Sequence, residues 1–317
     1  MTTPADDAAL AAGAFVQYAI DNTESPADDA GASILDTYLP GDNLFGSQWY
    51  LNNTGSGYDI NIASAWDDYT GRGVKVAVLD DGFDYLHSDL VANYDTSLDI
   101  DIKDSDGDAF ALSGNNHGTQ VMGVIGAVDN GSGIVGVASG ATMVGIRQGV
   151  GASGSVAQIS EAFATFDQFD VVNNSWTYTG YFFDNFDTLY FATIANELID
   201  AVDNGRDGLG TVVVFAAGNS GADGQNVNYH AFQNSPFTIT VGGMTTAGTP
   251  SSTSTPGAAV LVAAPMNNIL TTDRSGGAGS NSTDHVSVSG TSFSAPMVSG
   301  VAALMLEADS ALGYRDV

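Results

Sequence analysis

Residues 287–306 read SVSGTSFSAPMVSGVAALML, and this stretch is the starting point for both the fold and the site. Ser292 follows Gly290-Thr291 and begins a long apolar run typical of a buried helix. Pro296 falls in the first turns of that run, where a missing N–H is tolerated. A serine at this position could simply cap the helix. The pattern Gly-Thr-Ser-x-Ser-Ala-Pro is long, however, and rarely arises by chance, so Ser292 is a candidate nucleophile.

On the N-terminal side of this stretch, short β-branched and apolar runs alternate with segments of helical periodicity. Five runs are predicted to be buried strands: 74–79, 143–147, 170–175, 211–217 and 237–243. Segment 185–203 favours a helix, because apolar residues recur near helical spacing at Leu189, Ile194, Leu198, Ile199 and Val202. This alternation predicts an α/β fold with a parallel sheet covered by helices on both faces. The site of such a fold lies at the carboxyl ends of the strands.

Three further polar residues lie just after a predicted strand or at the start of a predicted helix. Asp80 directly follows 74–79 and precedes a turn glycine, so its carboxylate could orient a histidine, although Asp-Gly is also an ordinary turn. His117, in NNHGTQVMGVIGAV, opens a predicted helix, and the small Gly118 beside it allows another segment to approach closely. Asn219, in VVVFAAGNSG, follows a buried strand, where its amide could stabilise an oxyanion or simply belong to a turn.

Together these motifs resemble the subtilase family of serine peptidases. Asp, His and Ser occur in the family's chain order, within VLDDG, HGTQVMG, AAGNSG and GTSFSAP. The resemblance covers about residues 42–317 and implies a three-layer subtilisin-like α/β fold, mainly a parallel sheet flanked by helices. It also implies peptide-bond hydrolysis by an Asp-His-Ser triad with an Asn oxyanion donor, at Asp80, His117, Ser292 and Asn219. The alternative is a catalytically silent protease-like domain that serves adhesion or binding.

The composition fits an acidic globular protein. Against 37 Asp and Glu stand 7 Lys and Arg, a formal net charge of −30, which disfavours nucleic acid or an anionic membrane as a partner. The 317 residues include no cysteine, which excludes disulfides, thiol catalysis and cysteine-held zinc. No apolar run is long enough to span a membrane. Besides the candidate His117, His87 and His285 lie in polar sequence and are expected to be exposed.

The ends of the chain differ from its centre. Residues 1–41 are acidic and alanine-rich and are predicted to form a tail or linker before a catalytic domain at 42–317. The first residues lack the basic region of a Sec signal peptide. The last residues, LGYRDV, carry no helix-stop signal, so the catalytic domain is expected to be truncated there. The resemblance implies polypeptide substrates, a propeptide or downstream domain outside this chain, and an extracellular or cell-envelope location.

Within the family, the kexin- and furin-like proprotein convertases are the most similar branch, on stretches such as DNLFGSQWYLNNTG and DDGFDYLHSDL. Convertases cut after paired basic residues and use acidic pockets. Asp81 matches an acid of the second pocket, but Gln225 and His230 stand where the branch has aspartates. Burying an unpaired Arg or Lys is costly, so we expect a neutral, apolar or aromatic residue before the cleaved bond. The other expected substrate-binding residues are Ser175, Trp176, Ala217 and Gly218.

The resemblance also implies structural calcium, which prefers several oxygen ligands. The first site would combine three side chains with three backbone carbonyls, at Asp42, Asp89, Asn130, Val128, Ser132 and Ile134. A second candidate lies in LDIDIKDSDGDAF, where the acids that match a convertase site are Asp101, Asp106 and Asp108. Five aspartates around Lys103 repel one another and invite a counter-ion, although a solvated acidic loop is the alternative. A convertase calcium beside the substrate pocket is expected to be absent, because Gln225 replaces one of its carboxylates.

Overall fold

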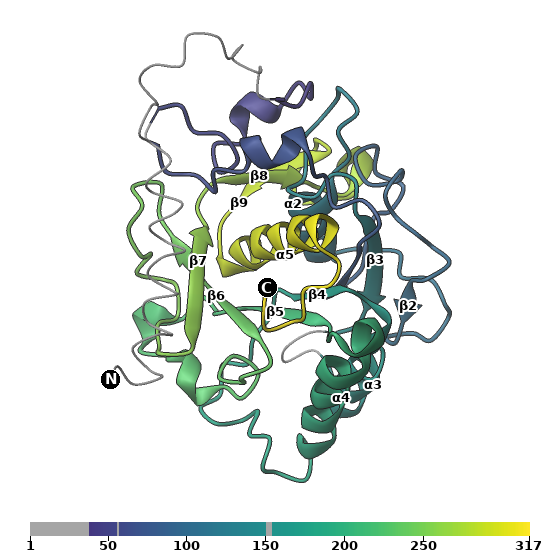
Figure 1. The fold of residues 1–317 in the computed structure, drawn as a ribbon, viewed down its shortest axis with the longest axis vertical. Coiled ribbons are helices and arrows are strands. Elements are labelled where there is room, and N and C mark those ends of the chain that lie inside the picture. Colours follow the sequence, from purple (N-terminus) through teal and green to yellow (C-terminus); the bar gives the residue numbers. More distant parts are fainter. Residues whose placement is uncertain (1–37, 56, 150–153) are drawn as a thin grey trace. The chain divides into compact units, whose positions relative to one another are not determined.

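A parallel sheet forms the centre of the fold. The computed structural model describes residues 38–55, 57–149 and 154–317, so the predicted tail lies almost wholly outside the described residues. Within them, seven strands pair in the order β2-β3-β1-β4-β5-β6-β7, and every pairing is parallel (Figure 1). In chain order, β1 to β7 span Lys75–Asp80, Ile100–Asp101, Thr142–Arg147, Val171–Asn174, Val212–Ala216, Ile239–Met244 and Val260–Pro265. A separate antiparallel pair consists of β8 (Ile269–Thr272) and β9 (His285–Val288).

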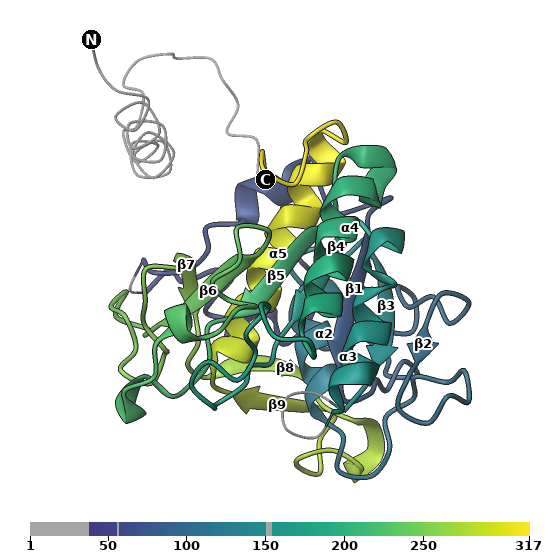
Figure 2. The ribbon, with the colours of Figure 1, turned by 90° about the horizontal axis from the view of Figure 1, so that it is seen from below.

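Helices cover both faces of this sheet (Figure 2). On one face lie α2 (His117–Gly126) and α5 (Thr291–Ala308), and on the other lie α3 (Val156–Phe163) and α4 (Ala192–Gly208). Alternation along β1 explains the two layers, because successive strand side chains point to opposite faces. Val76 and Val78 pack in the cluster of α2 and α5, whereas Ala77 and Leu79 pack in that of α3 and α4. The predicted three-layer α/β fold is confirmed.

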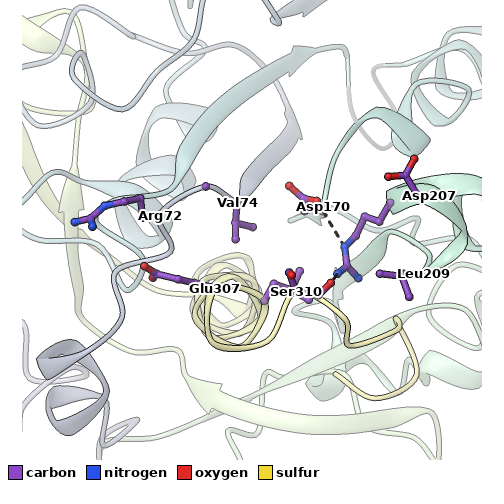
Figure 3. A pocket seen from close by; sticks show the side chains of 10 residues that line it. Arg72, Val74, Asp170, Asp207, Leu209, Glu307 and Ser310 are labelled. Atoms are coloured by element: carbon purple, nitrogen blue, oxygen red, sulfur yellow. Dashed lines mark hydrogen bonds and ion pairs between the residues drawn. The ribbon is translucent and has the colours of Figure 1, made fainter.

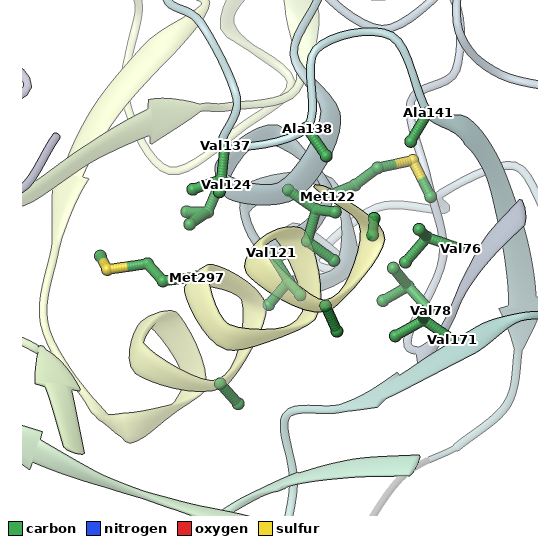
Figure 4. Packing of buried hydrophobic residues seen from close by; sticks show 14 of the residues in the cluster. Val76, Val78, Val121, Met122, Val124, Val137, Ala138, Ala141, Val171 and Met297 are labelled. Carbon is green, nitrogen blue, oxygen red and sulfur yellow. The ribbon is translucent and has the colours of Figure 1, made fainter. Parts of the chain in front are cut away.

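Buried apolar side chains fill the space between α2, α5 and the sheet (Figure 4). Val121 and Met122 of α2 are fully buried with Val76 of β1. Each such side chain stabilises the fold by about 1.5–3 kcal/mol relative to exposure. A side chain at Gly300 of α5 would come within 2.6 Å of Val137, so glycine is required for this approach. The long helix that contains Ser292 is therefore held firmly at the centre of the molecule.

The helix predicted at 185–203 begins and ends later in the chain. Three of its predicted core residues are buried on α4: Ile194, Leu198 and Val202. Leu189, however, is 88% exposed and precedes the helix, and Ile199 is 39% exposed. The carbonyl of Thr188 accepts the N–H groups of Phe191 and Ala192, which makes a turn before the helix. That turn brings Phe191 into the core in place of Leu189.

Strand prediction was accurate to within two residues at each end for the five predicted strands. The predictions missed β2, the edge strand β7 and the β8–β9 pair. β7 is partly solvent-facing, with Leu261 73% exposed, which weakens its resemblance to a buried strand.

The expectation that His87 is exposed is wrong. Its ring is fully buried, with Nε2 2.8 Å from the Asp284 carbonyl oxygen and Nδ1 accepting the N–H of Asp89 at 3.0 Å. His285 is also largely covered, because its side chain is 17% exposed and Nε2 lies 2.8 Å from Asp89 Oδ2. These rings join distant loops, and polarity of the local sequence gave no sign of that role.

Candidate active site

The carboxyl edge of the sheet gathers the candidate catalytic residues. Asp80 ends β1, Ser175 directly follows β4, and Asn219 lies shortly after β5. Because β1, β4 and β5 are neighbours in the sheet, their ends present these residues along one edge. His117 and Ser292 reach the same edge from the first turns of α2 and α5.

Asp80 and His117 form a close pair. The Asp80 side chain is fully buried, and both of its carboxylate oxygens lie 2.9 Å from His117 Nδ1. The His117 side chain remains 34% exposed. Its Nε2 has no hydrogen-bond partner among the described residues. One ring nitrogen is thus fixed by a buried acid while the other is available to a reacting group.

Neighbouring carboxylates raise the pKa of His117. Burial of the ring opposes protonation, but the charge of Asp80, its hydrogen bond and the charge of Asp81 outweigh it and raise the pKa to about 8. Burial and the charge of Asp80 raise the pKa of Asp81 to about 6, so Asp81 is charged at neutral pH. Asp81 Oδ1 also accepts the N–H of Gly118 at 2.8 Å. Asp81 therefore both holds the start of α2 and places negative charge beside the ring.

Gly118 allows this close arrangement. A Cβ there would lie 2.5 Å from the Gly82 carbonyl oxygen and 2.9 Å from the Phe83 ring. Any side chain would push α2, and with it His117, away from Asp80. The close approach predicted from the sequence is confirmed.

Ser292 lies in the first turn of α5 and is bonded to Ser175. Its hydroxyl donates to the Ser175 carbonyl oxygen at 3.1 Å, and the Ser175 hydroxyl donates to the Ser292 carbonyl oxygen at 2.7 Å. No hydrogen bond joins Ser292 to His117 in the described part of the chain. The next residue, Phe293, has its ring centre 5.7 Å from that of His117, so the two helix starts are in contact. Nucleophile–base hydrogen bonds are commonly loose before substrate binds.

Asn219 is positioned by the start of the same helix. Its Oδ1 accepts the backbone N–H of Thr291 at 2.9 Å and the Thr291 hydroxyl at 3.1 Å. This leaves Nδ2 as a donor on an exposed side chain. The N–H of Ser292 belongs to the first helical turn, where amides have no intrahelical acceptor. Two N–H groups at a helix N-terminus therefore suit a developing negative charge.

The predicted substrate-binding residues divide into backbone and side-chain positions. Ala217 is buried, and Gly218 has a positive φ of 98°. The Trp176 ring is only 6% exposed, and its centre lies 5.3 Å from those of Phe215 and Phe232. Trp176 can therefore meet a substrate only through its backbone.

Gln225 and His230 lie together, but with an acid that sequence reasoning missed. His230 Nδ1 lies 3.0 Å from Oδ1 of Asp184, which is fully buried. The pocket region thus contains a carboxylate, contrary to the expectation that none is present, although His230 pairs with it. Asp184 lies within the aromatic run at 181–186, and nothing local marks it as functional.

Two cavities lie at opposite edges of the sheet. One of about 370 Å³ adjoins the segment that follows Ser175 and is lined by Gly154, Val156, Thr177, Tyr178, Thr179, Gly180 and Phe183. Another of about 390 Å³ lies where β1 and β4 begin, and its lining includes Arg72, Asp170 and Glu307 (Figure 3). Three of its charged groups, Asp170, Arg206 and Glu307, bind other parts of the protein. Arg206 lies 3.6 Å from Asp170, and Glu307 accepts two backbone N–H groups. One stretch of the first cavity's lining begins two residues after Ser175, which exchanges hydrogen bonds with Ser292.

The first candidate calcium site brings Asp42 and Asn130 together. The Asn130 N–H lies 3.3 Å from Asp42 Oδ1, while Asp42 Oδ2 is buried without a hydrogen-bond partner in the residues described. Burial and the neighbouring Asp129 raise the pKa of Asp42 to about 6. A buried, unpartnered carboxylate oxygen beside a second carboxylate fits a hard cation.

Asp89, the other acid of this site, has partners within the protein. Its Oδ2 lies 2.8 Å from His285 Nε2 and accepts the Ile134 N–H at 3.0 Å. A Cβ at Gly133 would lie 2.1 Å from the same carboxylate, so the loop wraps closely around Asp89. The remaining predicted ligands lie in this loop, at Val128, Ser132 and Ile134. His285 is a partner that the sequence did not indicate.

The second candidate cluster has a counter-ion inside the protein. Arg147, which is 2% exposed at the end of β3, lies 3.3 Å from Asp101 Oδ1 and 2.7 Å from Asp104 Oδ2. Backbone N–H groups also donate to the Asp101 carboxylate, from Lys103, Asp104 and Asp106. The idea that Lys103 alone faces five aspartates is therefore wrong.

The other two acids of this cluster are exposed and bind local groups. Asp106 accepts the Asp108 N–H at 3.0 Å, and Asp108 accepts the Phe110 N–H at 3.0 Å and the Tyr85 hydroxyl at 2.9 Å. Across the described ranges, no three His, Asp or Glu side chains are arranged to hold a metal ion. Because Arg147 and backbone N–H groups already bind the Asp101 carboxylate, its donor set fits calcium less well than that at Asp42, where Oδ2 has no partner among the described residues.

Comparisons with known proteins agree with this architecture. A model of the peptidase S8 subtilase family matches residues 71–317. The chain is 34% identical to Furin-like protease 2 of Drosophila melanogaster over 297 residues, which are 87% of this chain and 17% of that protein. It is also 34% identical to human Proprotein convertase subtilisin/kexin type 7 over 294 residues, 87% of this chain and 36% of that protein. The chain thus spans well under half the length of these relatives.

A solved structure shows the same fold. The serine protease of Aeromonas sobria superposes with a TM-score of 0.80 at 24% identity, covering 93% of this chain and 59% of that chain. At this identity the likeness concerns the fold alone. No helix among the described residues is long and apolar enough to cross a membrane.

Proposed function

This chain belongs to the subtilase family, and we propose that it is a serine endopeptidase that cleaves polypeptides with Ser292 as its nucleophile. One observation carries the proposal. A buried carboxylate, Asp80, holds Nδ1 of His117, while Nε2 of the same ring has no partner among the described residues and lies beside the helix whose first turn contains Ser292. This is the arrangement that a general base needs.

The proposed reaction follows from these positions. Ser292 Oγ leaves the Ser175 carbonyl and attacks the substrate carbonyl carbon, while His117 Nε2 takes the hydroxyl proton. The imidazolium that forms is stabilised by Asp80. His117 then gives the proton to the leaving amine, and in the second half-reaction it activates water to release the acyl group from Ser292.

The developing oxyanion would be bound by Asn219 Nδ2 and the Ser292 N–H. Asn219 Oδ1 is held by Thr291, so its amide is oriented before the reaction begins. Preorganised donors of this kind cost no rearrangement in the transition state. The positive end of the α5 dipole adds to the same effect.

For the substrate, we propose a neutral side chain before the cleaved bond. Both expected acids of the pocket are replaced, and the buried Asp184 is already paired with His230. An Arg or Lys would lose water without gaining a free carboxylate. Matched peptides with Phe, Leu or Arg at this position test the point, and higher kcat/KM for Arg would refute it.

We also propose one structural calcium, at Asp42, and an extracellular or cell-envelope location. The unpartnered Asp42 Oδ2 supports the metal site. The role proposed for calcium is to hold the loop at 128–134 against Asp42 and Asp89, away from the chemistry. The location rests on the family alone.

Labelling with a fluorophosphonate tests the proposed activity. The folded wild-type chain is expected to react covalently with the probe, whereas Ser292→Ala is expected not to react. Circular dichroism of both proteins confirms folding. A folded wild-type chain that does not react would instead indicate a silent protease-like domain that binds or adheres.

A further inference from the structure

A chain of polar contacts, buried at one end and half-buried or exposed at the other, ties the segment 177–180 to the loop that contains Gln225. We call the segment the pocket wall, because all four of its residues line the 370 Å³ cavity described above. Gln225 Nε2 donates to the carbonyl oxygen of Thr179 in the wall at 2.6 Å. Gln225 Oε1 lies 3.4 Å from His230 Nε2, and His230 Nδ1 lies 3.0 Å from Asp184 Oδ1. The chain thus begins at a buried carboxylate and ends on the wall.

The hydrogen-bond roles along this chain are fixed by chemistry. A carbonyl oxygen can only accept, so Gln225 must direct its amide nitrogen to Thr179 and its oxygen to His230. An ionised Asp184 can likewise only accept. Both ring nitrogens of His230 therefore face acceptors, and only the doubly protonated ring satisfies both.

Burial makes this arrangement restrictive. Asp184 is fully buried and His230 is 2% exposed, within a set of packed aromatic rings. An isolated charge would be costly there, but a hydrogen-bonded Asp184–His230 pair carries no net charge. Oδ2 of Asp184 also lies 3.4 Å from the Phe232 N–H. Another titratable group near the pair is the Tyr178 hydroxyl, which is buried and whose pKa is raised by burial and by the charge of Asp184.

We propose that the Asp184–His230 ion pair holds Gln225 in the one amide orientation that secures the pocket wall, so that His230 and Gln225 are positioning residues for the substrate. The wall begins two residues after Ser175, which exchanges hydrogen bonds with Ser292. A displaced wall would therefore alter the cavity that receives the substrate without removing any group that reacts. This inference rests on the proposed peptidase function and deepens it.

Enzyme kinetics on the intact chain test the positioning role. Gln225→Met removes the donor to Thr179 and is expected to raise KM about three- to tenfold, the range for one hydrogen bond, with kcat nearly unchanged. Gln225→Glu puts a carboxylate oxygen against the Thr179 carbonyl and is expected to raise KM further. Gln168→Met, at an exposed glutamine near the start of β4, is the matched control and is expected to leave KM unchanged.

A double-mutant cycle separates a relay from independent structural effects. Asp184→Asn keeps the shape but removes the charge that favours the protonated ring, so it is expected to raise KM as Gln225→Met does. If the residues act in series, the double variant is no worse than the more impaired single variant. Multiplied KM effects in the double variant, or unchanged KM in either Gln225 variant, would overturn the proposal.

A measurement that needs no activity keeps this test separate from that of the function. Nitrogen NMR of the histidine rings at pH 7, assigned among the 4 histidines with His230→Gln, is expected to show both His230 nitrogens protonated. A neutral His230 ring in the wild type would overturn the relay even if peptidase activity is found. A doubly protonated ring in a chain without activity would uphold the relay and reject the proposed function.

Discussion

Two histidines of this protein are each bonded through Nδ1 to a buried aspartate, but they differ in exposure and in what lies beside Nε2. His117 Nδ1 lies 2.9 Å from Asp80, and His230 Nδ1 lies 3.0 Å from Asp184. The His117 side chain is 34% exposed and its Nε2 has no partner in the part of the chain that the structure describes, whereas the His230 side chain is 2% exposed and its Nε2 faces Gln225. An Asp–His pair is thus a candidate base only where the second nitrogen is open to a reacting group. Where that nitrogen is occupied, the pair serves to hold structure.

Replacing each aspartate by asparagine gives the largest expected contrast. Asp80→Asn is expected to lower kcat by about 10⁴-fold, the size known for triad aspartates, including that of the related subtilisin. The reason is that the imidazolium loses its stabilising charge and its fixed orientation. Asp184→Asn is expected to leave kcat within about threefold, since its predicted effect is on KM. Similar losses of kcat in the two variants would remove the distinction between the pairs.

The second largest expected effect concerns Asn219, the proposed oxyanion donor near the Asp80–His117 pair. Asn219→Ala is expected to lower kcat by about 10²–10³-fold with little change in KM, a range measured in subtilisin for the corresponding donor. Gln233→Ala, which removes a buried amide bonded to the Ala216 carbonyl, serves as a structural comparison. Its loss is expected in thermal stability, so a fall in Tm without a fall in kcat is the control result.

A third Asp–His pair, Asp89 with His285, differs from the other two because Asp89 is also a predicted calcium ligand. Chelation is expected to lower Tm by about 5–10 °C, as follows from about 2.7 kcal/mol of linked binding at 100 times Kd. Asp42→Asn is expected to abolish this response, because it weakens the one site whose donor set fits. Asp106→Asn is the control and is expected to retain the response. Scanning calorimetry of each variant with and without chelator measures the change in Tm. If only Asp106→Asn lost the response, the calcium site would be assigned to the second cluster instead.

The smallest expected effect is a shift in pH dependence. His117 must be neutral to act as a base, so kcat/KM is expected to rise with pH through about 8. The stability contributed by its pairing with Asp80 runs the other way: it is complete below about 6.5 and lost as pH rises through about 8. Asp81→Asn removes a negative charge beside the ring, so the midpoint of the activity profile is expected to move to lower pH. An unchanged or higher midpoint would mean that Asp81 does not act on His117.

Much of the fold was readable from local sequence because its signals are local. Five strands were located to within two residues, since buried parallel strands read as apolar runs. The edge strand β7 was missed because exposed residues such as Leu261 interrupt that signal. The helix α4 was placed too early, since apolar spacing alone does not show that a turn at Thr188 precedes it.

The candidate site likewise has a part that the sequence predicted and a part that it did not. The sequence by itself determined which residues could form the triad, because each motif combines a reactive side chain with the glycines and small residues that its close packing needs, as at Gly118. The order of motifs also determined the family resemblance. Neither inference required knowledge of a distant contact.

Only the tertiary structure decided which charges are paired. Arg147 meets Asp104 across 43 positions of the sequence, and His230 meets Asp184 across 46. The same is true of Asp89, which meets His285 across 196 positions. Such pairs arise when the sheet and its loops bring segments together in a dry interior, where an unpaired charge is costly. No local sequence pattern predicts these pairs, so the partner of each carboxylate became known only from the fold.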